Sequence, residues 1–397
     1  MSETTLRFLP PHEGRVDLLL IAGEHSGDEH AARMVRELLA KRPGLKVAAL
    51  GGPQLGAAGA QLLYDLTASS VVGFVEVLKN YGFFRAVFEE TLRWIEAERP
   101  RAVCFVDYPG FNLRVARALR ERGVSAKGGG RVKTLFYISP QIWAWKAGRR
   151  FTMARDLDGM AAIFPFEPKH YADTTLPVEF VGHPFVAADY AAPVRYDAQG
   201  PVLLLPGSRK QAVARIFPVL LAGFEAFART HSEARAVVLY PSEDILEVLR
   251  AARPGGKVEL VRIRADEKAG GTPALPAAAV LTSSGTMSMH CALAGIPGAV
   301  AYRANPLTYV LGRMLVKVPY LGIANLLLGE PMYPEFLQGA ATPEALAAQL
   351  LDCVDNPARR DATHARAAQL RARLSEPATG TAADWLSRHL AEPLAPT

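Results

Sequence analysis

Two stretches of this sequence, about half a chain apart, join an apolar run to a glycine-containing turn and then to a pattern of helical period. The first starts at Val16 and reads VDLLLIAGEHSGDEHAARMVREL, and the second starts at Pro201 and reads PVLLLPGSRKQAVARIFPVLL. This order is typical of a buried parallel strand that leads through a loop into a helix. Two such starts predict two doubly wound α/β domains that face a cleft, with ligands at the carboxyl ends of their strands.

The length of the chain, 397 residues, exceeds what one hydrophobic core usually supports. We expect an N-terminal Rossmann-like domain over residues 1–190 and a C-terminal Rossmann-like domain over residues 191–397. At the end of the chain, Thr342 followed by Pro343 predicts a capped helix start, and further helices are expected at Asp361–Ser375 and Thr381–Leu390. The expected strands are Leu18–Ala22, Val47–Leu50, Ala102–Val106, Thr134–Ile138, Val202–Leu205, Ala236–Tyr240, Val258–Val261, Val280–Ser283 and Gly298–Tyr302.

The net charge of +6 favours anionic partners such as nucleotide phosphates or phospholipid headgroups. The chain has no dense Lys/Arg tract and no nucleic-acid motif, so we expect no nucleic-acid partner. The three cysteines, Cys104, Cys291 and Cys353, form no CxxC pair and indicate a reducing compartment. The N-terminus lacks an apolar secretion signal, and the uncharged run Ala269–Tyr302 is interrupted by Gly, Pro and His. We therefore expect a cytoplasmic protein that is at most peripheral to a membrane.

Two turns in the second half have the composition of a phosphate site. In Leu205–Arg209, Gly207 allows close backbone approach, Ser208 is placed to cap the following helix, and Arg209 suits a diphosphate. A second turn, with Ser284, Gly285 and Thr286, follows the strand at Val280. Two such turns on adjacent strands predict one nucleotide held from two sides, although two ordinary polar turns also explain the residues.

Carboxylates end two strands of the first half. Glu24 and His25 follow the first strand, where they suit acid/base work or binding of sugar hydroxyls, and Ser26 with Glu29 has the spacing of a capping box. Asp107 ends the apolar run AVCFV, where partial desolvation would favour a general base. Capping of a nearby backbone turn explains Asp107 equally well.

Two aromatic segments suggest contacts with lipid or sugar. The stretch from Gly73 to Phe88 combines large apolar side chains with Lys79 and Arg85, as expected for an interfacial patch or for an amphipathic helix that covers the core. Trp143, in the run YISPQIWAW, suits stacking on a sugar or on an acyl chain, or core packing. The candidate acceptor and membrane residues are Phe74, Val75, Val77, Leu78, Phe83, Phe84 and Trp143.

Taken together, the motifs resemble those of the lipid-A-disaccharide synthases, which are inverting GT-B glycosyltransferases. The matching stretches are AGEHSGD, GFVEVL, VDYPGFN, YISPQIWAW, FPFEP, VGHP, LLPGSR, SSGT and the run from Ala301 to Leu327, in this order. They span most of the chain. The resemblance implies a GT-B fold in which the C-terminal helices close back on the N-terminal domain.

The resemblance also implies the reaction. A UDP-2,3-diacylglucosamine donor and a 2,3-diacylglucosamine 1-phosphate acceptor would give a β-1,6-linked disaccharide 1-phosphate and UDP. Asp107 would be the base for the acceptor hydroxyl, and Glu24 would support the active site. The enzyme would work at the inner-membrane surface, where the 73–88 segment would dock, and a homodimer is expected through the C-terminal region. The implied donor site contains Gly207, Ser208, Arg209, Ser284, Gly285, Thr286, His290, Tyr302, Arg303 and Asn325.

The chain departs from the family pattern at His290, where a glutamate that holds ribose hydroxyls is usual, and at Ala212. These departures suggest one rival function, a catalytically silent protein that binds lipid or nucleotide. A second rival is another GT-B transferase that uses UDP-N-acetylglucosamine and a non-lipid acceptor. No DxD-like or His-rich cluster is present in the sequence, so we expect no cofactor and no metal requirement.

Overall fold

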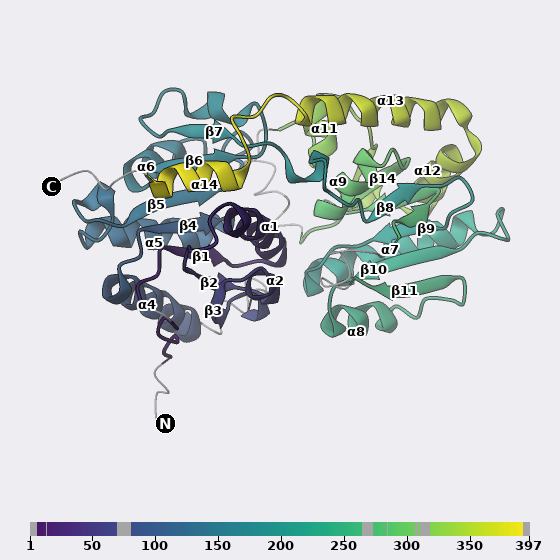
Figure 1. Ribbon diagram of the computed structural model, residues 1–397. Helices are drawn as coiled ribbons and strands as arrows, with labels where there is room; N and C mark the ends of the chain where they lie inside the picture. Colours follow the sequence, from purple (N-terminus) through teal and green to yellow (C-terminus); the bar gives the residue numbers. More distant parts are fainter. Residues whose placement is uncertain are drawn as a thin grey trace. The chain divides into compact units, whose positions relative to one another are not determined.

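The computed structural model describes residues 6–12, 14–69, 81–263, 273–283, 285–305, 309 and 318–391. The chain divides into two compact units: unit 1 comprises Met1–Pro184 with Glu376–Thr397, and unit 2 comprises Phe185–Ser375. Each unit is built on its own parallel sheet with helices packed against it (Figure 1). The expected fold of two Rossmann-like α/β domains is therefore confirmed, but the expected bounds of 1–190 and 191–397 differ from the observed ones, because Glu376–Thr397 belongs to unit 1.

Unit 1 contains a seven-stranded sheet in the order β3-β2-β1-β4-β5-β6-β7, in which every neighbouring pair is parallel. The carboxyl ends of all these strands therefore share one edge, called here the carboxyl edge of unit 1. The central strands are buried at every residue, as expected where helices cover both faces. The strands are β1 (Leu18–Ala22), β2 (Val47–Gly51), β3 (Gln61–Asp65), β4 (Ala102–Val106), β5 (Lys133–Tyr137), β6 (Gly159–Ala162) and β7 (Val178–Phe180).

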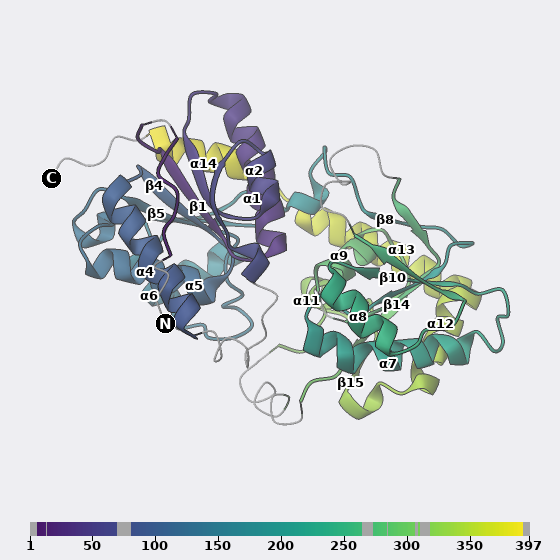
Figure 2. The same cartoon turned by 90° about the horizontal axis from the view of Figure 1, so that it is seen from below.

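The helices of unit 1 form two layers, one on each face of the sheet (Figure 2). One layer contains α1 (His25–Lys41), α2 (Pro53–Ala57) and α14 (Ala382–Ala391). The other contains α4 (Tyr81–Glu98), α5 (Pro109–Glu121) and α6 (Arg149–Asp156). Because α14 packs on α1, the end of the described chain does close back on the first unit. The helix before it, α13 (Pro357–Leu374), stays with unit 2.

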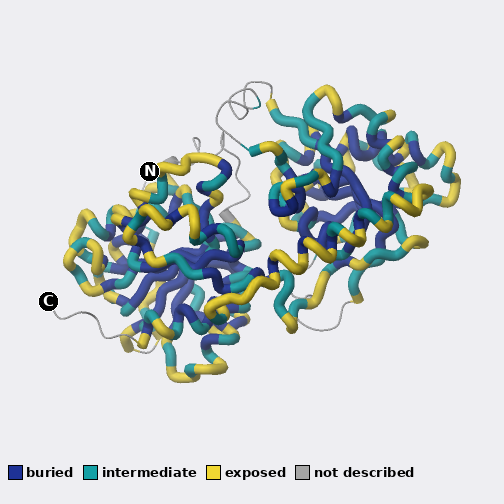
Figure 3. The backbone as a smooth tube through the Cα atoms, turned by 90° about the horizontal axis from the view of Figure 1, so that it is seen from above, coloured by how far each residue is buried: buried dark blue, intermediate teal, exposed yellow. Residues whose placement is uncertain are grey.

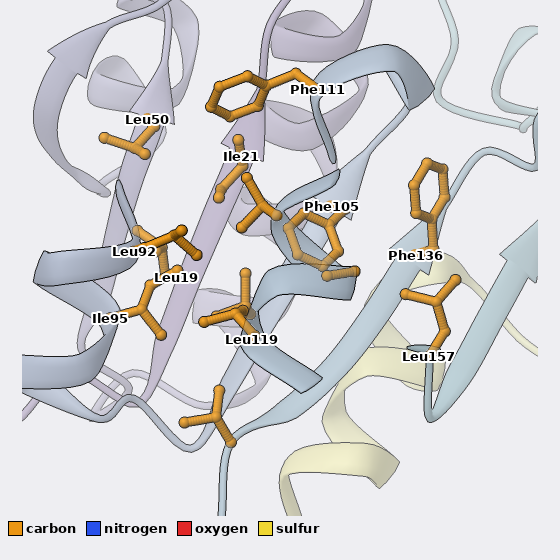
Figure 4. Packing of buried hydrophobic residues seen from close by; sticks show 14 of the residues in the cluster. Leu19, Ile21, Leu50, Leu92, Ile95, Phe105, Phe111, Leu119, Phe136 and Leu157 are labelled. Carbon is orange, nitrogen blue, oxygen red and sulfur yellow. The ribbon is translucent and has the colours of Figure 1, made fainter. Parts of the chain in front are cut away.

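The core of unit 1 forms where apolar strand residues meet the α4–α5 layer (Figure 4). Leu19, Ile21 and Phe105 of the sheet belong to one cluster with Leu92 of α4 and Leu119 of α5, all at most 1% exposed. Each such side chain contributes about 1.5–3 kcal/mol when fully buried. This packing fixes the strand ends from which the candidate site residues project.

Unit 2 contains a six-stranded parallel sheet in the order β11-β10-β9-β13-β14-β15 and a two-stranded sheet of β8 and β12. Its central strands lie in a buried layer (Figure 3). The strands are β8 (Val194–Tyr196), β9 (Val202–Leu205), β10 (Ala236–Tyr240), β11 (Val258–Arg262), β12 (Leu275–Ala277), β13 (Ala279–Thr282), β14 (Gly298–Tyr302) and β15 (Glu335–Leu337).

Two groups of helices pack within unit 2. α7 (Lys210–Phe227) contacts both α8 (Glu243–Ala251) and α12 (Pro343–Asp355), and α9 (Thr286–Leu293), α11 (Ile323–Leu328) and α13 contact one another. Short 3-10 turns lie at Thr67–Ser69, Ala126–Gly128, Glu167–Tyr171, Pro184–Val186 and Gln338–Ala340.

Two of the three expected side-chain caps of helices differ from the structure. Thr342 does cap α12, since its hydroxyl accepts a hydrogen bond from the Ala345 amide at 3.2 Å. The capping box at Ser26 is wrong, because α1 begins at His25 and Glu24 occupies the N-cap position. Ser208 does not cap α7 either: Arg209 holds that position and no side-chain cap bond forms there.

Candidate active site

The first two candidate catalytic residues lie on neighbouring strand ends of unit 1. β1 and β4 pair in parallel with Ala22 opposite Val106, so Glu24 and Asp107 both follow at the carboxyl edge. The two turns are in direct contact, because a Cβ added to Gly23 would lie 2.2 Å from the ring of Tyr108. Only glycine therefore fits between them. The structure thus brings together the AGEHSGD and VDYPGFN motifs.

The turn that carries Asp107 is strained. Asp107 and Tyr108 have consecutive positive φ angles of 47° and 48°, a conformation that residues with side chains rarely adopt. Asn112, buried on α5, holds the turn by donating a hydrogen bond of 2.7 Å from Nδ2 to the carbonyl of Asp107. Strain at a half-buried carboxylate is typical of a functional position, because folding alone does not favour it.

Asp28, the other carboxylate of AGEHSGD, has a structural role. It is 1% exposed, and its two oxygens accept hydrogen bonds from the amides of Gly52, Gln54 and Leu55 at 2.8–3.3 Å. Asp28 thereby ties α1 to the turn after β2 and caps α2. Burial raises its pKa and these amides oppose the rise. His25, in contrast, is exposed.

Glu167, in FPFEP, is a buried carboxyl to which the motif analysis gave no role. It is 1% exposed and accepts hydrogen bonds from the Trp143 indole at 3.3 Å and from the Phe164 amide at 3.2 Å. Burial, with a smaller contribution from the charge of Asp107, raises the pKa of Glu167 to about 8. Glu167 therefore carries a proton near the candidate base at neutral pH. In the sequence, the sign of a buried carboxyl at this position is that the glutamate stands between Phe166 and Pro168 at the end of an apolar run.

The aromatic candidates have different surroundings. Trp143 is half-buried and its ring lies edge-on to Phe166 at 5.3 Å, in a cluster beyond the ends of β5 and β6. Phe83 is 38% exposed in the first turn of α4, with its centroid 5.7 Å from that of half-buried Phe84. The other candidates, Phe74, Val75, Val77 and Leu78, lie outside the described residues.

The two expected phosphate turns are adjacent in unit 2. β9 and β13 pair in parallel with Leu205 opposite Thr282, and the Ser283 amide donates to the Leu205 carbonyl at 2.9 Å. Gly207 has a φ of 105°, and a Cβ there would lie 3.2 Å from the Ser283 hydroxyl. α7 begins immediately after Arg209 and α9 at Thr286, so two helix N-termini meet at this edge. Ser284 lies outside the described residues.

Other candidate donor residues are engaged within unit 2. The Asn325 side chain, 1% exposed, donates to the Tyr333 carbonyl and to Glu335, and accepts from the Tyr333 amide. His290 is 3% exposed and its ring lies 4.0 Å from that of Phe185 and parallel to that of Tyr190.

Tyr302 ends β14, and Arg303, which follows it, donates to the Ala341 carbonyl at 2.6 Å. A cavity of about 1190 Å³ in unit 2 lies at the opposite edge of the sheet, beside Val202 and Lys257. The candidate donor residues therefore do not line that cavity.

Within the described ranges, no helix combines the length and apolar character that a bilayer crossing demands. The same part of the chain contains no group of three or more His, Cys, Asp or Glu side chains arranged to hold a metal ion.

Comparison with known structures supports the fold. The chain resembles the crystal structure of the glycotransferase of kitacinnamycin with a TM-score of 0.57 at 16% identity, over 96% of this chain and 100% of that one. It also resembles UDP-GlcNAc 2-epimerase from Neisseria meningitidis bound to UDP-GlcNAc, with a TM-score of 0.56 at 11% identity, over 87% of this chain and 93% of that one. At these identities the likeness shows the fold, which is that of GT-B glycosyltransferases.

Comparison of sequences supports a narrower conclusion. Lipid-A-disaccharide synthase of Geobacter sulfurreducens is 35% identical over 372 residues, covering 90% of this chain and 92% of the relative. The Anaeromyxobacter sp. (strain K) enzyme of the same name is 36% identical over 371 residues, covering 91% and 94%. The family model described as lipid-A-disaccharide synthetase matches residues 18–384. The chain belongs to the lipid-A-disaccharide synthetase family.

Proposed function

We propose that this chain transfers 2,3-diacylglucosamine from its UDP derivative to 2,3-diacylglucosamine 1-phosphate, giving the β-1,6-linked disaccharide 1-phosphate and UDP. Membership of the family supports the reaction. The observation that carries the assignment of its chemistry is the contact between the AGEHSGD and VDYPGFN turns, which places Glu24 and Asp107 at one edge of unit 1.

Inversion at the anomeric carbon takes place in a single in-line displacement. The acceptor hydroxyl oxygen attacks the anomeric carbon, its proton passes to Asp107, and the bond to the β-phosphate oxygen breaks so that UDP leaves with the bonding electrons. Holding both sugars in line supplies much of the rate enhancement. The strained turn and Asn112 hold the backbone of Asp107, and so the point from which its carboxylate would reach the acceptor hydroxyl.

The departing diphosphate requires positive charge. Arg209 at the N-cap position of α7 and the N-terminus of α9 supply a guanidinium and two sets of backbone N–H groups. The backbone at the same edge belongs to Gly207, Ser208, Gly285 and Thr286. The proposal also assigns Ser284, Tyr302 and Arg303 to the donor site. Asn325 and His290 are buried and packed within unit 2. We therefore assign both an indirect role, which is to hold this edge of the sheet in place.

Both substrates carry acyl chains, so the proposal includes peripheral association with the inner membrane on its cytoplasmic side. Exposed Phe83 supports contact through the region from residue 73 to residue 88. A homodimer is part of the same proposal and is tested by light scattering of the purified protein.

The decisive experiment mixes the purified protein with the defined donor and acceptor in detergent and detects the product by mass spectrometry. The expected result is a disaccharide 1-phosphate, with one molecule of UDP released for each disaccharide formed. Product formation with UDP-N-acetylglucosamine and a non-lipid acceptor in place of the acylated pair would contradict the proposal, as would binding of both substrates without turnover.

A further inference from the structure

A second surface of unit 1, which begins at the end of the YISPQIWAW motif, has the composition of a lipid contact. Trp145 is 40% exposed and Phe151 is 52% exposed, and they are two of the four large apolar side chains that the described residues expose. Both flank the start of α6. We call this region the α6 surface, comprising Trp145, Lys146, Arg149, Phe151 and Lys169.

Cations surround both aromatic rings. Lys146 Nζ lies 4.4 Å and Arg149 Cζ 5.6 Å from the centroid of the Trp145 ring, and Arg150 Cζ lies 4.2 Å from that of Phe151. Arg150 is neutralised, because Asp173 accepts two hydrogen bonds from it at 2.6 and 2.7 Å. Lys146, Arg149 and Lys169 have no such carboxylate among the described residues, so the α6 surface carries a net positive charge.

A notch of about 340 Å³ opens beside these residues. Arg150, Lys169 and His170 line it together with Asp173, over an apolar floor that includes Ile142. Burial lowers the pKa of His170, so its imidazole is neutral at pH 7 and offers a hydrogen bond rather than a charge. Two cations and one carboxylate give the notch one excess positive charge, which suits a phosphodiester with a single negative charge.

The position of the α6 surface matches a bilayer contact. α4 and α6 lie in one helical layer of unit 1, and each begins at the carboxyl edge because it follows a strand of the parallel sheet (Figure 2). Phe83, in the first turn of α4, is 38% exposed. Three of the four exposed large apolar side chains among the described residues therefore lie at the same end of one layer.

The side chains favour a lipid partner over a protein partner. Tryptophan is enriched where one side of a ring is apolar and the other wet, as at the membrane interface. Protein interfaces are depleted of lysine, whereas lysine and arginine near an anionic membrane are each worth about 1 kcal/mol. Lys146 and Lys169 therefore fit anionic phospholipid better than the surface of another protein.

We propose that the α6 surface docks on an anionic bilayer, with Trp145 and Phe151 entering the interface and the Arg150–Lys169 notch receiving a phospholipid phosphate. This inference rests on the proposed function in one respect only: the enzyme must reach lipid substrates. The two claims have separate measurements, since vesicle binding requires no turnover and turnover in detergent requires no bilayer.

The test uses the whole protein and sedimentation with vesicles of phosphatidylcholine, with or without phosphatidylglycerol. Trp145→Ala/Phe151→Ala and Arg149→Gln/Lys169→Gln are compared with wild type. At about 1 kcal/mol each, loss of two cations is expected to weaken binding to phosphatidylglycerol vesicles about 30-fold. The aromatic pair should weaken it at least tenfold, and both variants should keep their turnover in detergent.

Matched controls place the same chemical changes elsewhere on unit 1. Leu9→Ala truncates a side chain that is 54% exposed, and Lys127→Gln/Arg131→Gln removes two exposed cations before β5, at the opposite edge of the sheet. These controls should bind vesicles like wild type. Equal binding by all variants would overturn the proposal, as would equal affinity for both kinds of vesicle. Failure of turnover in detergent with intact vesicle binding would instead overturn the proposed function alone.

Discussion

Asp107 occupies a backbone conformation that few aspartates adopt, and the same strained turn carries the Tyr108 ring over Gly23. The neighbouring strand end then supplies Glu24. The turn and the hydrogen bond from Asn112 to the Asp107 carbonyl hold the backbone from which the carboxylate projects. This position at the carboxyl edge of unit 1 is the basis for the proposal that Asp107 acts as the general base.

Replacing Asp107 with Asn tests that role. The amide keeps the shape of the side chain but cannot accept the acceptor's proton, so kcat is expected to fall about 10²–10⁴-fold. The measurement is UDP release with both acylated substrates. Asp244→Asn, an exposed position in the first turn of α8, is the control and should leave kcat unchanged. Near wild-type turnover of Asp107→Asn would remove this residue as the base.

Glu167 gives a prediction about pH. Its pKa is about 8 in the folded protein against an ordinary value of 4.5, so the folded state holds the proton more tightly. Protonated Glu167 therefore adds to the free energy of unfolding. This contribution is fully present below about pH 4.5 and is lost as the pH rises towards 8, at up to about 1.4 kcal/mol per pH unit. Glu167→Gln should flatten this decline. All four tryptophans, Trp94, Trp143, Trp145 and Trp385, lie in unit 1, so denaturant unfolding followed by fluorescence reports on this unit.

The control for Glu167 is Glu121→Gln. Arg117 lowers the pKa of the exposed Glu121, so this residue affects stability only in more acidic solution. It should leave the decline between about pH 5 and 8 intact. An unchanged slope in Glu167→Gln would show that the buried carboxyl is not protonated in the folded state.

Residue spacing predicted part of the site. The pairing of Glu24 with Asp107 and of Gly207 with the 283–286 turn follows from one rule, that parallel strands end at the same edge. The burial of Glu167 and the triple acceptor role of Asp28 depend on residues far away in the sequence, and no local pattern reports them. Ser26 was misassigned as a cap because its spacing to Glu29 fits that motif while α1 begins one residue earlier.

At the scale of elements, the sequence predicted the strands that are long and apolar. β1, β4 and β9 consist of apolar residues only, and both faces of each are covered. β3 (QLLYD), β6 (GMAA) and β7 (VEF) were missed, because polar or small residues remove the apolar signal at the margin of the sheet. Their positions are set by pairing with a neighbour that is already in place.

The docking of α14 on α1 gives a prediction at this scale. Trp385 of α14 is 1% exposed, and truncation of a buried tryptophan costs about 3–5 kcal/mol. Trp385→Ala should therefore lower the free energy of unfolding of unit 1 by this amount in fluorescence-detected denaturation. Trp145→Ala, in which the lost ring is 40% exposed, is the matched control and should cost under about 1 kcal/mol. Equal effects of the two substitutions would contradict the assignment of α14 to unit 1.

At the scale of the whole molecule, the proposed reaction draws groups from both units, with the base in one and the diphosphate site in the other. Unit 2 supplies positive charge through Arg209 and two helix N-termini. Fixed donors of this kind can stabilise a leaving group without a divalent ion.

Turnover should therefore persist after exhaustive treatment with EDTA. The measurement is UDP release before and after chelation, with Mg²⁺ added back as the control. Loss of activity that Mg²⁺ restores would show that an ion assists the departure of UDP. Arg209→Ala tests the protein's own contribution in the same assay and should lower kcat about 10²–10³-fold, as removal of a preorganised charge donor does elsewhere.

The return of the chain to unit 1 has a consequence for biosynthesis. Nascent proteins generally acquire structure from the N-terminal side onwards while they emerge from the ribosome. Here the face of α1 against which α14 packs stays uncovered until residues 185–375 have been translated. Unit 1 is therefore completed in two stages: all seven strands of its sheet, which end at Phe180, are synthesised well before α14 can pack on α1.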